Sequence, residues 1–261
     1  MSEEQLPESK LGTKQHWDDV YQREISTFDD IGEEGEVWFG TQSAKKMLTW
    51  TIQNLPPSLD PPPRILDLGT GNGYNLFLLS SKRGKYPGAV LKGVDYSQGS
   101  VDLARLIRDK RASGEVESSD EDDSDDDEQD NESGWTDSTA DISFDAADIL
   151  RGDPIDGGPW DLVTDKGTYD AIALSSDPIP PTNLSPAELY PIQVSKLVKP
   201  GGYFLITSCN FTEEEIKKRF TKSTLGFSYH SRVNHPTFTF GGSKGSTVCT
   251  VAFQKTASHA E

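Results

Sequence analysis

The sequence is poor in the residues that build metal centres, covalent cross-links and membrane spans. Its two cysteines, Cys209 and Cys249, are far apart and form no Cys-x-x-Cys or Cys/His spacing, which argues against a zinc site or a disulfide framework and predicts buried free thiols. No apolar run approaches the roughly 18 residues that a membrane helix needs. The four histidines have no catalytic or ligand spacing. We therefore expect no metal, no membrane association and a cytoplasmic location.

Basic residues are scarce beside acidic ones, with 25 Lys and Arg against 43 Asp and Glu and a net charge of -18 at pH 7. Twelve of the acidic residues lie between positions 115 and 132, where the chain has no basic residue. Such a block repels itself and buries little, so residues 113–139 are predicted to form a disordered insert. The insert is either a solvated loop or a segment that attracts a basic partner electrostatically, in which case binding is sensitive to salt. Nucleic acid is not an expected partner, because phosphate binding needs clustered Lys and Arg.

The remaining sequence alternates strand and helix patterns, which predicts parallel strands joined by right-handed crossovers. Thr212 and Glu215 form a capping-box pattern that starts the helix after Asn210. We expect a Rossmann-like, doubly wound α/β sheet of seven strands, mostly parallel with an antiparallel C-terminal strand, in a monomeric domain spanning 61–255. Residues 1–60 are expected to be a helical extension packed on that core. Strands are predicted at 64–68, 89–94, 142–147, 161–164, 203–207, 229–233 and 248–253, and helices at 14–21, 43–55, 74–81, 98–111 and 186–198.

The first of these strands leads into a glycine-rich turn with the spacing G-x-G-x-G, followed by a helix. The dinucleotide fingerprint G-x-G-x-x-G would need its third glycine at Tyr74, which weakens a nicotinamide interpretation. An acidic residue just before the turn disfavours a pyrophosphate and favours a cation. A sulfonium amino acid fits better, so the turn is predicted to bind S-adenosyl-L-methionine through Asp67, Gly69, Thr70, Gly71 and Gly73.

Acidic residues also follow the next two strands. Asp95, with Tyr96 beside it, lies 24 residues after Gly71, where a carboxylate accepts hydrogen bonds from ribose hydroxyls. Asp148 is placed to accept from the adenine amine, with Ile149 against the ring. Ligands of open α/β sheets bind at the carboxyl ends of strands, so these residues are predicted to share one crevice. Each aspartate taken alone is also compatible with a helix cap or a surface turn.

Several motifs together resemble a known family, the lysine methyltransferases of eukaryotic elongation factor 1-alpha, which are class I, seven-β-strand enzymes. The resemblance covers nearly the whole chain and departs at the acidic insert and the proline-rich connector near residues 56–63. It implies S-adenosyl-L-methionine as methyl donor, a lysine of elongation factor 1-alpha as acceptor, and a place for Trp38 beside the cofactor. The motifs are Leu11-Gly12-Thr13-Lys14, Trp17-Asp18 with Tyr21, Gly35-Glu36-Val37-Trp38-Phe39-Gly40, Asp67-Leu68-Gly69-Thr70-Gly71-Asn72-Gly73, Asp165-Lys166-Gly167-Thr168-Tyr169-Asp170-Ala171-Ile172, Ile206-Thr207-Ser208-Cys209-Asn210, Pro236-Thr237-Phe238 and Phe240-Gly241-Gly242.

The candidate catalytic residues lie at the end of the fourth predicted strand. Asp165 is expected to orient the incoming amine through its carboxylate or its backbone carbonyl. Lys166 either lines the site or pairs with Asp170. Tyr169, together with Trp38 and Phe39, is a candidate aromatic wall for the lysine stem, because aromatic faces attract cations; core packing explains Phe39 equally well.

Two other functions remain compatible with the sequence. In the first, the fold is the same but the methyl acceptor is a small molecule or a protein N-terminus. In the second, the chain is a non-catalytic binding module whose active part is the acidic insert. Calorimetry with S-adenosylmethionine distinguishes the second from an enzyme. If the cofactor site is right, Asp67→Ala or Asp95→Ala weakens cofactor binding, whereas deletion of residues 115–132 leaves it nearly unchanged.

Overall fold

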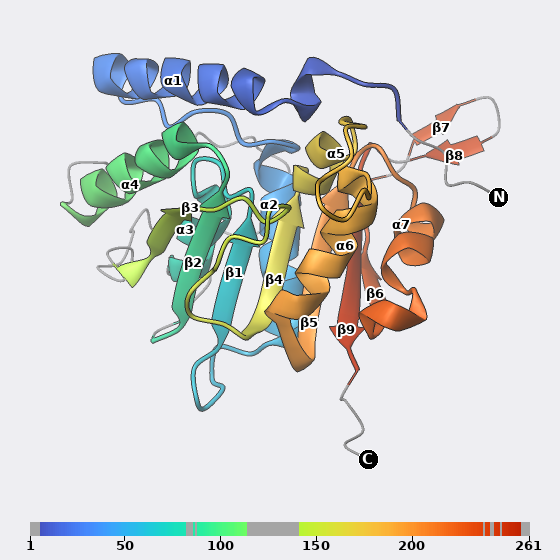
Figure 1. Ribbon diagram of the computed structural model, residues 1–261. Coiled ribbons are helices and arrows are strands. Elements are labelled where there is room, and N and C mark those ends of the chain that lie inside the picture. Colours follow the sequence, from blue (N-terminus) through green and yellow to red (C-terminus); the bar gives the residue numbers. More distant parts are fainter. Residues whose placement is uncertain are drawn as a thin grey trace.

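The computed structural model describes residues 6–81, 86, 88–113, 141–236, 238–240, 243–245 and 247–256. The predicted disordered insert, 113–139, lies outside these residues except for its first position. The main sheet has the strand order β3-β2-β1-β4-β5-β9-β6 (Figure 1). Its strands are β1 (Arg64–Leu68), β2 (Val90–Asp95), β3 (Ser143–Ala146), β4 (Trp160–Lys166), β5 (Val198–Ser208), β6 (Phe227–Val233) and β9 (Cys249–Lys255).

The expected sheet type is confirmed. Strands β1 to β5 pair in parallel, and β9 is antiparallel to both β5 and β6. A second, two-stranded sheet of β7 (Phe238–Phe240) and β8 (Ser243–Gly245) was not predicted. The helices are α1 (Lys14–Ile31), α2 (Gly40–Asn54), α3 (Tyr74–Ser80), α4 (Gln98–Ala112), α5 (Thr168–Ile172), α6 (Pro186–Leu197) and α7 (Glu213–Phe220), with short 3-10 turns at Lys10–Gly12 and Ser223–Leu225.

Strand residues alternate between two hydrophobic clusters, because successive side chains of a strand point to opposite faces. Ile65 and Leu162 belong to the cluster that also contains residues of α1, α2, α3 and α4. Leu66 and Val163 belong to the cluster that contains residues of α6 and α7. The sheet is therefore buried on both faces, as a doubly wound fold requires.

Most predicted elements begin and end within a few residues of their observed bounds. Two of them, α1 and β5, differ more, and one short helix was not predicted. Helix α1 runs ten residues beyond the predicted end at Tyr21 and stops at Gly32, whose φ of 78° is the left-handed conformation that ends helices. Strand β5 begins at Val198, five residues before its predicted start, and its register shifts where β4 passes from Trp160 to Leu162. The five-residue helix α5 was not predicted.

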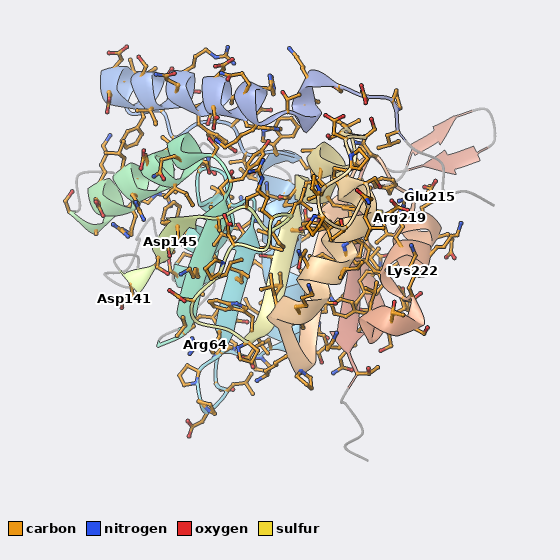
Figure 2. All side chains as sticks on the ribbon, in the orientation of Figure 1. Arg64, Asp141, Asp145, Glu215, Arg219 and Lys222 are labelled. Atoms are coloured by element: carbon orange, nitrogen blue, oxygen red, sulfur yellow. The ribbon has the colours of Figure 1, made fainter. Side chains whose placement is uncertain are left out.

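The carboxyl ends of the parallel strands face α1. Arg64, the first residue of β1, lies at the far end of the sheet from α1 (Figure 2). Helix α1 crosses above the opposite end, beside α4 (Figure 1). The cofactor crevice expected from the sequence is therefore an interface between the strand ends and the N-terminal helix. None of the described helices is long and apolar enough to cross a membrane.

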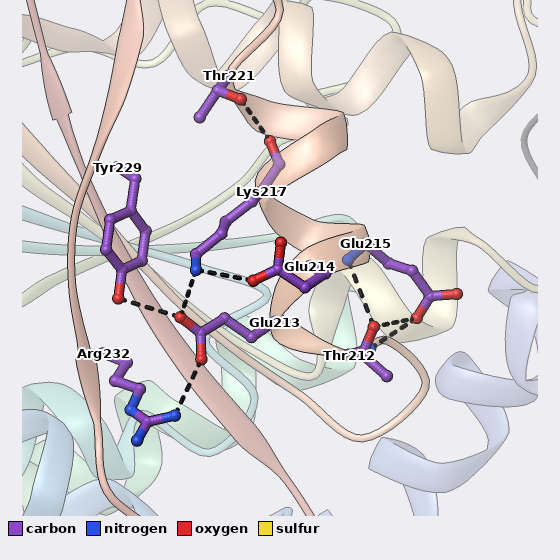
Figure 3. A network of polar contacts seen from close by, with 8 residues as sticks. All are labelled: Thr212, Glu213, Glu214, Glu215, Lys217, Thr221, Tyr229 and Arg232. Carbon is purple, nitrogen blue, oxygen red and sulfur yellow. Dashed lines mark hydrogen bonds and ion pairs between the residues drawn. The ribbon is translucent and has the colours of Figure 1, made fainter.

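A polar network stabilises the corner between α7 and the edge strand β6 (Figure 3). The predicted capping box is confirmed, because Thr212 Oγ1 accepts from the Glu215 amide (3.3 Å) and Glu215 Oε2 accepts from the Thr212 amide (2.8 Å). The Glu213 carboxylate accepts from Tyr229 Oη (3.0 Å) and pairs with Lys217 (2.7 Å). These groups are solvent-accessible, so each pair contributes only about 0–1 kcal/mol. The charged side chains also disfavour the pairing of a further strand with β6, which is at the edge of the sheet.

Candidate active site

One cavity of about 340 Å³ lies between the strand ends and α1. It collects residues from five of the sequence motifs, and it brings together the glycine turn, Asp95 and Asp148, as the sequence predicted. Nine of the thirteen predicted site residues line it: Trp38, Gly69, Thr70, Gly71, Asp95, Tyr96, Asp148, Ile149 and Lys166. The other four, Asp67, Gly73, Asp165 and Tyr169, are not part of the described lining.

The glycine turn needs glycine for two different reasons. Gly69 and Gly71 have φ values of 62° and 57° and face the cavity, so their backbone lies open to a ligand. A Cβ on Gly69 would lie 2.1 Å from Thr168 Oγ1, at the start of α5. Gly73 (φ 82°) instead faces the core, where a Cβ would lie 2.8 Å from the Phe144 ring. Gly73 is not part of the described cavity lining, so its contact with cofactor stays a prediction, and the absence of a side chain there lets α3 pack on β3.

Asp67 lies beneath the turn and is not part of the described cavity lining, so its direct contact with the cofactor stays a prediction. Its carboxylate accepts hydrogen bonds from Thr164 Oγ1 (2.6 Å), Thr70 Oγ1 (3.1 Å) and Asn75 Nδ2 (3.3 Å). Burial raises the pKa of Asp67, and these hydrogen bonds oppose the rise. Asp67 thus braces the turn from behind through Thr70, which does line the cavity.

Asp95 joins the glycine turn to the end of β2. Its carboxylate accepts from the backbone amides of Gly71 (3.2 Å) and Ser97 (3.0 Å). Each carboxylate oxygen has a further lone pair, so the group can still accept from hydroxyls in the cavity. Burial raises the pKa of Asp95, while the two amides favour the charged form. This arrangement suits recognition of a diol next to the turn.

Asp148 lines the cavity and also holds its own turn. Its carboxylate accepts from the amides of Leu150 (3.0 Å) and Arg151 (3.3 Å) and pairs with Arg151 Nε (3.3 Å). The turn-capping interpretation left open by the sequence is thus observed together with exposure to the cavity. Ile149 follows on the same wall. Acceptance of an adenine amine by Asp148 remains a prediction.

The Asp165 carboxyl does not face the cavity, which argues against its orienting an amine through that group, whereas orientation through its backbone carbonyl stays a prediction. The residue is fully buried, and its carboxyl accepts from Tyr190 Oη (2.6 Å) and from the amides of Thr168 (2.9 Å) and Tyr169 (3.1 Å). Burial raises the pKa of Asp165 to about 8, against the effect of these donors. The side chain caps the start of α5 and ties it to α6, so it serves the architecture of the site.

Tyr169 is a core residue, so its predicted place in an aromatic wall is wrong. It is fully buried, its ring stacks on Tyr190 with 5.4 Å between centroids, and its hydroxyl donates to the Ala187 carbonyl (3.1 Å). Phe39 has no place in the described lining either; it is half-buried and its ring packs on Gly167.

Lys166 lines the cavity, and its alternative pairing with Asp170 is wrong. Lys166 Nζ donates to the Trp38 carbonyl at 2.8 Å. Asp170 is instead satisfied by Ser208 Oγ (2.7 Å) and the Asn210 amide (2.7 Å). Burial lowers the pKa of Lys166 to about 8, although Asp67, Asp165 and Glu36 all act to raise it.

Comparison with known proteins places these features in a family. A sequence profile described as "Methyltransferase domain" matches residues 59–237. The protein-lysine N-methyltransferase efm4 of Schizosaccharomyces pombe is 40% identical over 256 residues, covering 95% of each chain. EEF1A lysine methyltransferase 2 of Homo sapiens is 33% identical over 247 residues, covering 95% of this chain and 87% of the human protein. The chain belongs to this methyltransferase family.

Solved structures agree on the fold. The magnesium protoporphyrin IX methyltransferase of Synechocystis PCC 6803, determined with bound SAH, superimposes with a TM-score of 0.53 at 14% identity, covering 94% of this chain and all of that one. At this identity the likeness concerns the fold alone. Family membership also rests on the near full-length relatives, whose matched region includes the N-terminal helices that the profile leaves out.

The cavity lining also includes residues that were not predicted as site residues from the sequence. Trp17 and Tyr21 of α1 were expected only to pack on the core, yet both also line the cavity. Trp17 packs against Trp38 at 5.0 Å between ring centroids. Glu24 and Glu36 line the cavity as well. The available signal was the cluster of motifs at 11–21 and 35–40, which lies outside the glycine-turn domain and pointed to a shared site. Among the described residues, no group of His, Cys, Asp and Glu is arranged to hold a metal ion.

Proposed function

We propose that this chain is an S-adenosylmethionine-dependent protein-lysine N-methyltransferase that modifies a lysine side chain of translation elongation factor 1-alpha. The observation that carries the proposal is the cavity at the glycine turn, with Asp95 and Asp148 at its rim. The substrate follows from the names of the full-length relatives, one of which is an EEF1A lysine methyltransferase. We also propose a cytoplasmic monomer, with residues 61–255 as the methyltransferase domain and 1–60 as its extension.

The residues of the cavity fit S-adenosylmethionine. Gly69 and Gly71 line the cavity without a side chain, which allows a ligand to approach their backbone closely, and Asp95 offers further lone pairs to ribose hydroxyls. Asp148 and Ile149 are candidates for the adenine edge and face. The carboxylates of Glu24, Glu36 and Asp95 around the cavity favour a cation such as a sulfonium over a pyrophosphate.

When bound, this cofactor supplies an electrophilic methyl group, and the chain has to present a neutral amine to it. A lysine ammonium has a reference pKa of about 10.4, so its deprotonation at pH 7 costs roughly 4.6 kcal/mol. Desolvation in the cavity, beside the rings of Trp17 and Trp38, lowers that cost. The nearby Lys166 ammonium acts in the same direction, because it disfavours a second cation.

Positioning provides most of the remaining rate enhancement. Holding a nucleophile in near-attack geometry contributes about 7–11 kcal/mol, which exceeds the deprotonation cost. The Asp165 carboxyl is buried away from the cavity, so the mechanism does not use this carboxyl as a base. We infer that the amine loses its proton to solvent as it enters the aromatic-lined cavity.

The proposal is tested with labelled S-adenosylmethionine and purified elongation factor 1-alpha. We expect label on one lysine, identified by mass spectrometry, and none on the protein in which that lysine is arginine. Heat-denatured enzyme is the control for non-enzymatic transfer. Persistent labelling of the arginine variant, or label at the N-terminus or on small molecules, would assign a different acceptor.

A further inference from the structure

A segment between α1 and α2 crosses the cavity, and we call residues 32–39 the strap. It is attached to three surrounding elements. The Glu34 carboxylate pairs with Arg111 Nε of α4 (2.8 Å), and the Glu34 carbonyl accepts from Asn72 Nδ2 of the glycine turn (3.0 Å). The Glu36 amide donates to Glu24 Oε1 of α1 (3.2 Å). Because the strap carries Trp38 into the cavity wall, its position helps to shape the site.

The end of the strap is held by β4. Lys166 extends from the last position of β4, and its ammonium donates to the Trp38 carbonyl at 2.8 Å. Next to this contact, Phe39 has a φ of 62°, a conformation that costs a non-glycine residue of order 1–3 kcal/mol. The Phe39 ring packs on Gly167, where a Cβ would lie only 3.1 Å from the ring. Packing of the Phe39 ring on Gly167, the residue that follows β4, thus helps to hold the strained backbone of Phe39 in place.

The ring of Trp38 is fixed from the other side by α1. It packs edge-on against Trp17 (5.0 Å between centroids, 61° between planes), and the Trp17 indole donates to the Leu11 carbonyl (2.7 Å). Trp38 therefore has its ring set by α1 and its backbone set by Lys166. Of these two constraints, only the one from Lys166 originates on a strand of the sheet, at the carboxyl end of β4.

We propose that Lys166 is a positioning residue that holds Trp38 and the strap over the cavity, and that it is neither the base nor the nucleophile of the reaction. Its contact with Trp38 needs an N–H donor, which both charge states of the amine provide. Burial lowers the pKa of Lys166 to about 8, against the raising effect of the nearby carboxylates, so the ammonium, which cannot accept a proton, still predominates at pH 7. This inference rests on the proposed function, because Trp38 matters to the reaction only if the cavity binds the cofactor and the substrate lysine.

The test compares Lys166→Met, which keeps the length of the side chain without a donor, with Lys166→Arg, which keeps a charged donor. Loss of one charge-assisted hydrogen bond at the site is expected to weaken cofactor binding by about tenfold in Lys166→Met. Lys166→Arg is expected to recover most of the affinity. Amide hydrogen exchange of residues 33–39 is expected to accelerate in Lys166→Met and to stay near wild type in Lys166→Arg.

Kinetics separate positioning from proton transfer. A positioning role predicts that Lys166→Met raises KM for the cofactor while the shape of the pH profile of kcat is kept. If both variants abolish kcat and remove an ionisation from that profile, Lys166 acts in the chemistry and the proposal is overturned. Wild-type affinity together with wild-type strap exchange in Lys166→Met also overturns it. Failure of the wild-type enzyme to bind S-adenosylmethionine would instead contradict the proposed function.

Discussion

Replacing Asp95 by alanine is expected to weaken S-adenosylmethionine binding by roughly 100-fold or more. Hydrogen bonds to a charged group contribute about 1.5–3 kcal/mol each, so losing the two expected from the ribose hydroxyls costs about 3 kcal/mol or more. The variant also frees the amides of Gly71 and Ser97, which the carboxylate now orders. Both effects act on the same ligand, one directly and one through the glycine turn.

Isothermal titration calorimetry of the full chain measures this effect. Asp102→Ala is the matched control, because Asp102 is exposed on α4, bonds only to Gln98 among the hydrogen bonds described, and lies outside the described cavity lining. The cofactor affinity of Asp95→Asn is expected to lie between those of wild type and Asp95→Ala, since the amide oxygen of asparagine keeps one acceptor. Equal affinities for wild type and Asp95→Ala, with unchanged melting temperatures, would remove Asp95 from the cofactor site.

Replacing Gly69 by alanine is expected to abolish detectable cofactor binding and to lower the free energy of unfolding by roughly 2–5 kcal/mol. A Cβ at φ 62° carries about 1–2 kcal/mol of backbone strain. It would also lie 2.1 Å from Thr168 Oγ1, and overpacking of this kind costs about 1–3 kcal/mol. Relief of the overlap pushes the turn into the cavity or α5 away from it, and either movement distorts the binding surface.

The chain offers a control that separates strain from overlap. Gly201 has a similar φ of 80°, but a Cβ added there would have no atom within 4 Å. Urea unfolding of Gly201→Ala therefore measures the backbone strain alone, and its cofactor affinity is expected to match wild type. Adding Thr168→Ala to Gly69→Ala is expected to restore part of the stability. A Gly69→Ala variant as stable as Gly201→Ala would contradict the close packing of the turn on α5.

The sequence was sufficient to predict the sheet and the position of the cavity. Alternating strand and helix patterns determine a doubly wound topology, and the glycine turn marks the end of β1. Asp95 and Asp148 were found because the carboxyl ends of parallel strands converge. In each of these cases the local pattern and the general topology of the fold suffice.

Side-chain direction at the strand ends was harder to predict. Asp165 and Lys166 are neighbours on β4, and successive strand residues face opposite sides of the sheet. Asp165 shares the side of Val163 and reaches Tyr190 of α6, whereas Lys166 turns the other way toward Trp38. The alternation alone argues against both residues entering one cavity, but which of them enters depends on the packing of α5 and the strap. Tyr169 was misplaced for the same reason, because the short helix α5 carries it into the core.

The contributions of α1 and the strap depend on contacts between distant segments. Trp17 and Trp38 meet across 21 positions of sequence, and no periodicity in either segment predicts their contact. Their motifs were visible, but their physical role required the folded chain.

Calorimetry of the purified wild-type chain, titrated separately with S-adenosylmethionine and with NAD⁺, tests the central claim most directly. The structure predicts saturable binding of S-adenosylmethionine at a single site and no heat of binding for the nicotinamide. Binding of NAD⁺ at the glycine turn, or no affinity for S-adenosylmethionine in a folded preparation, would contradict the account.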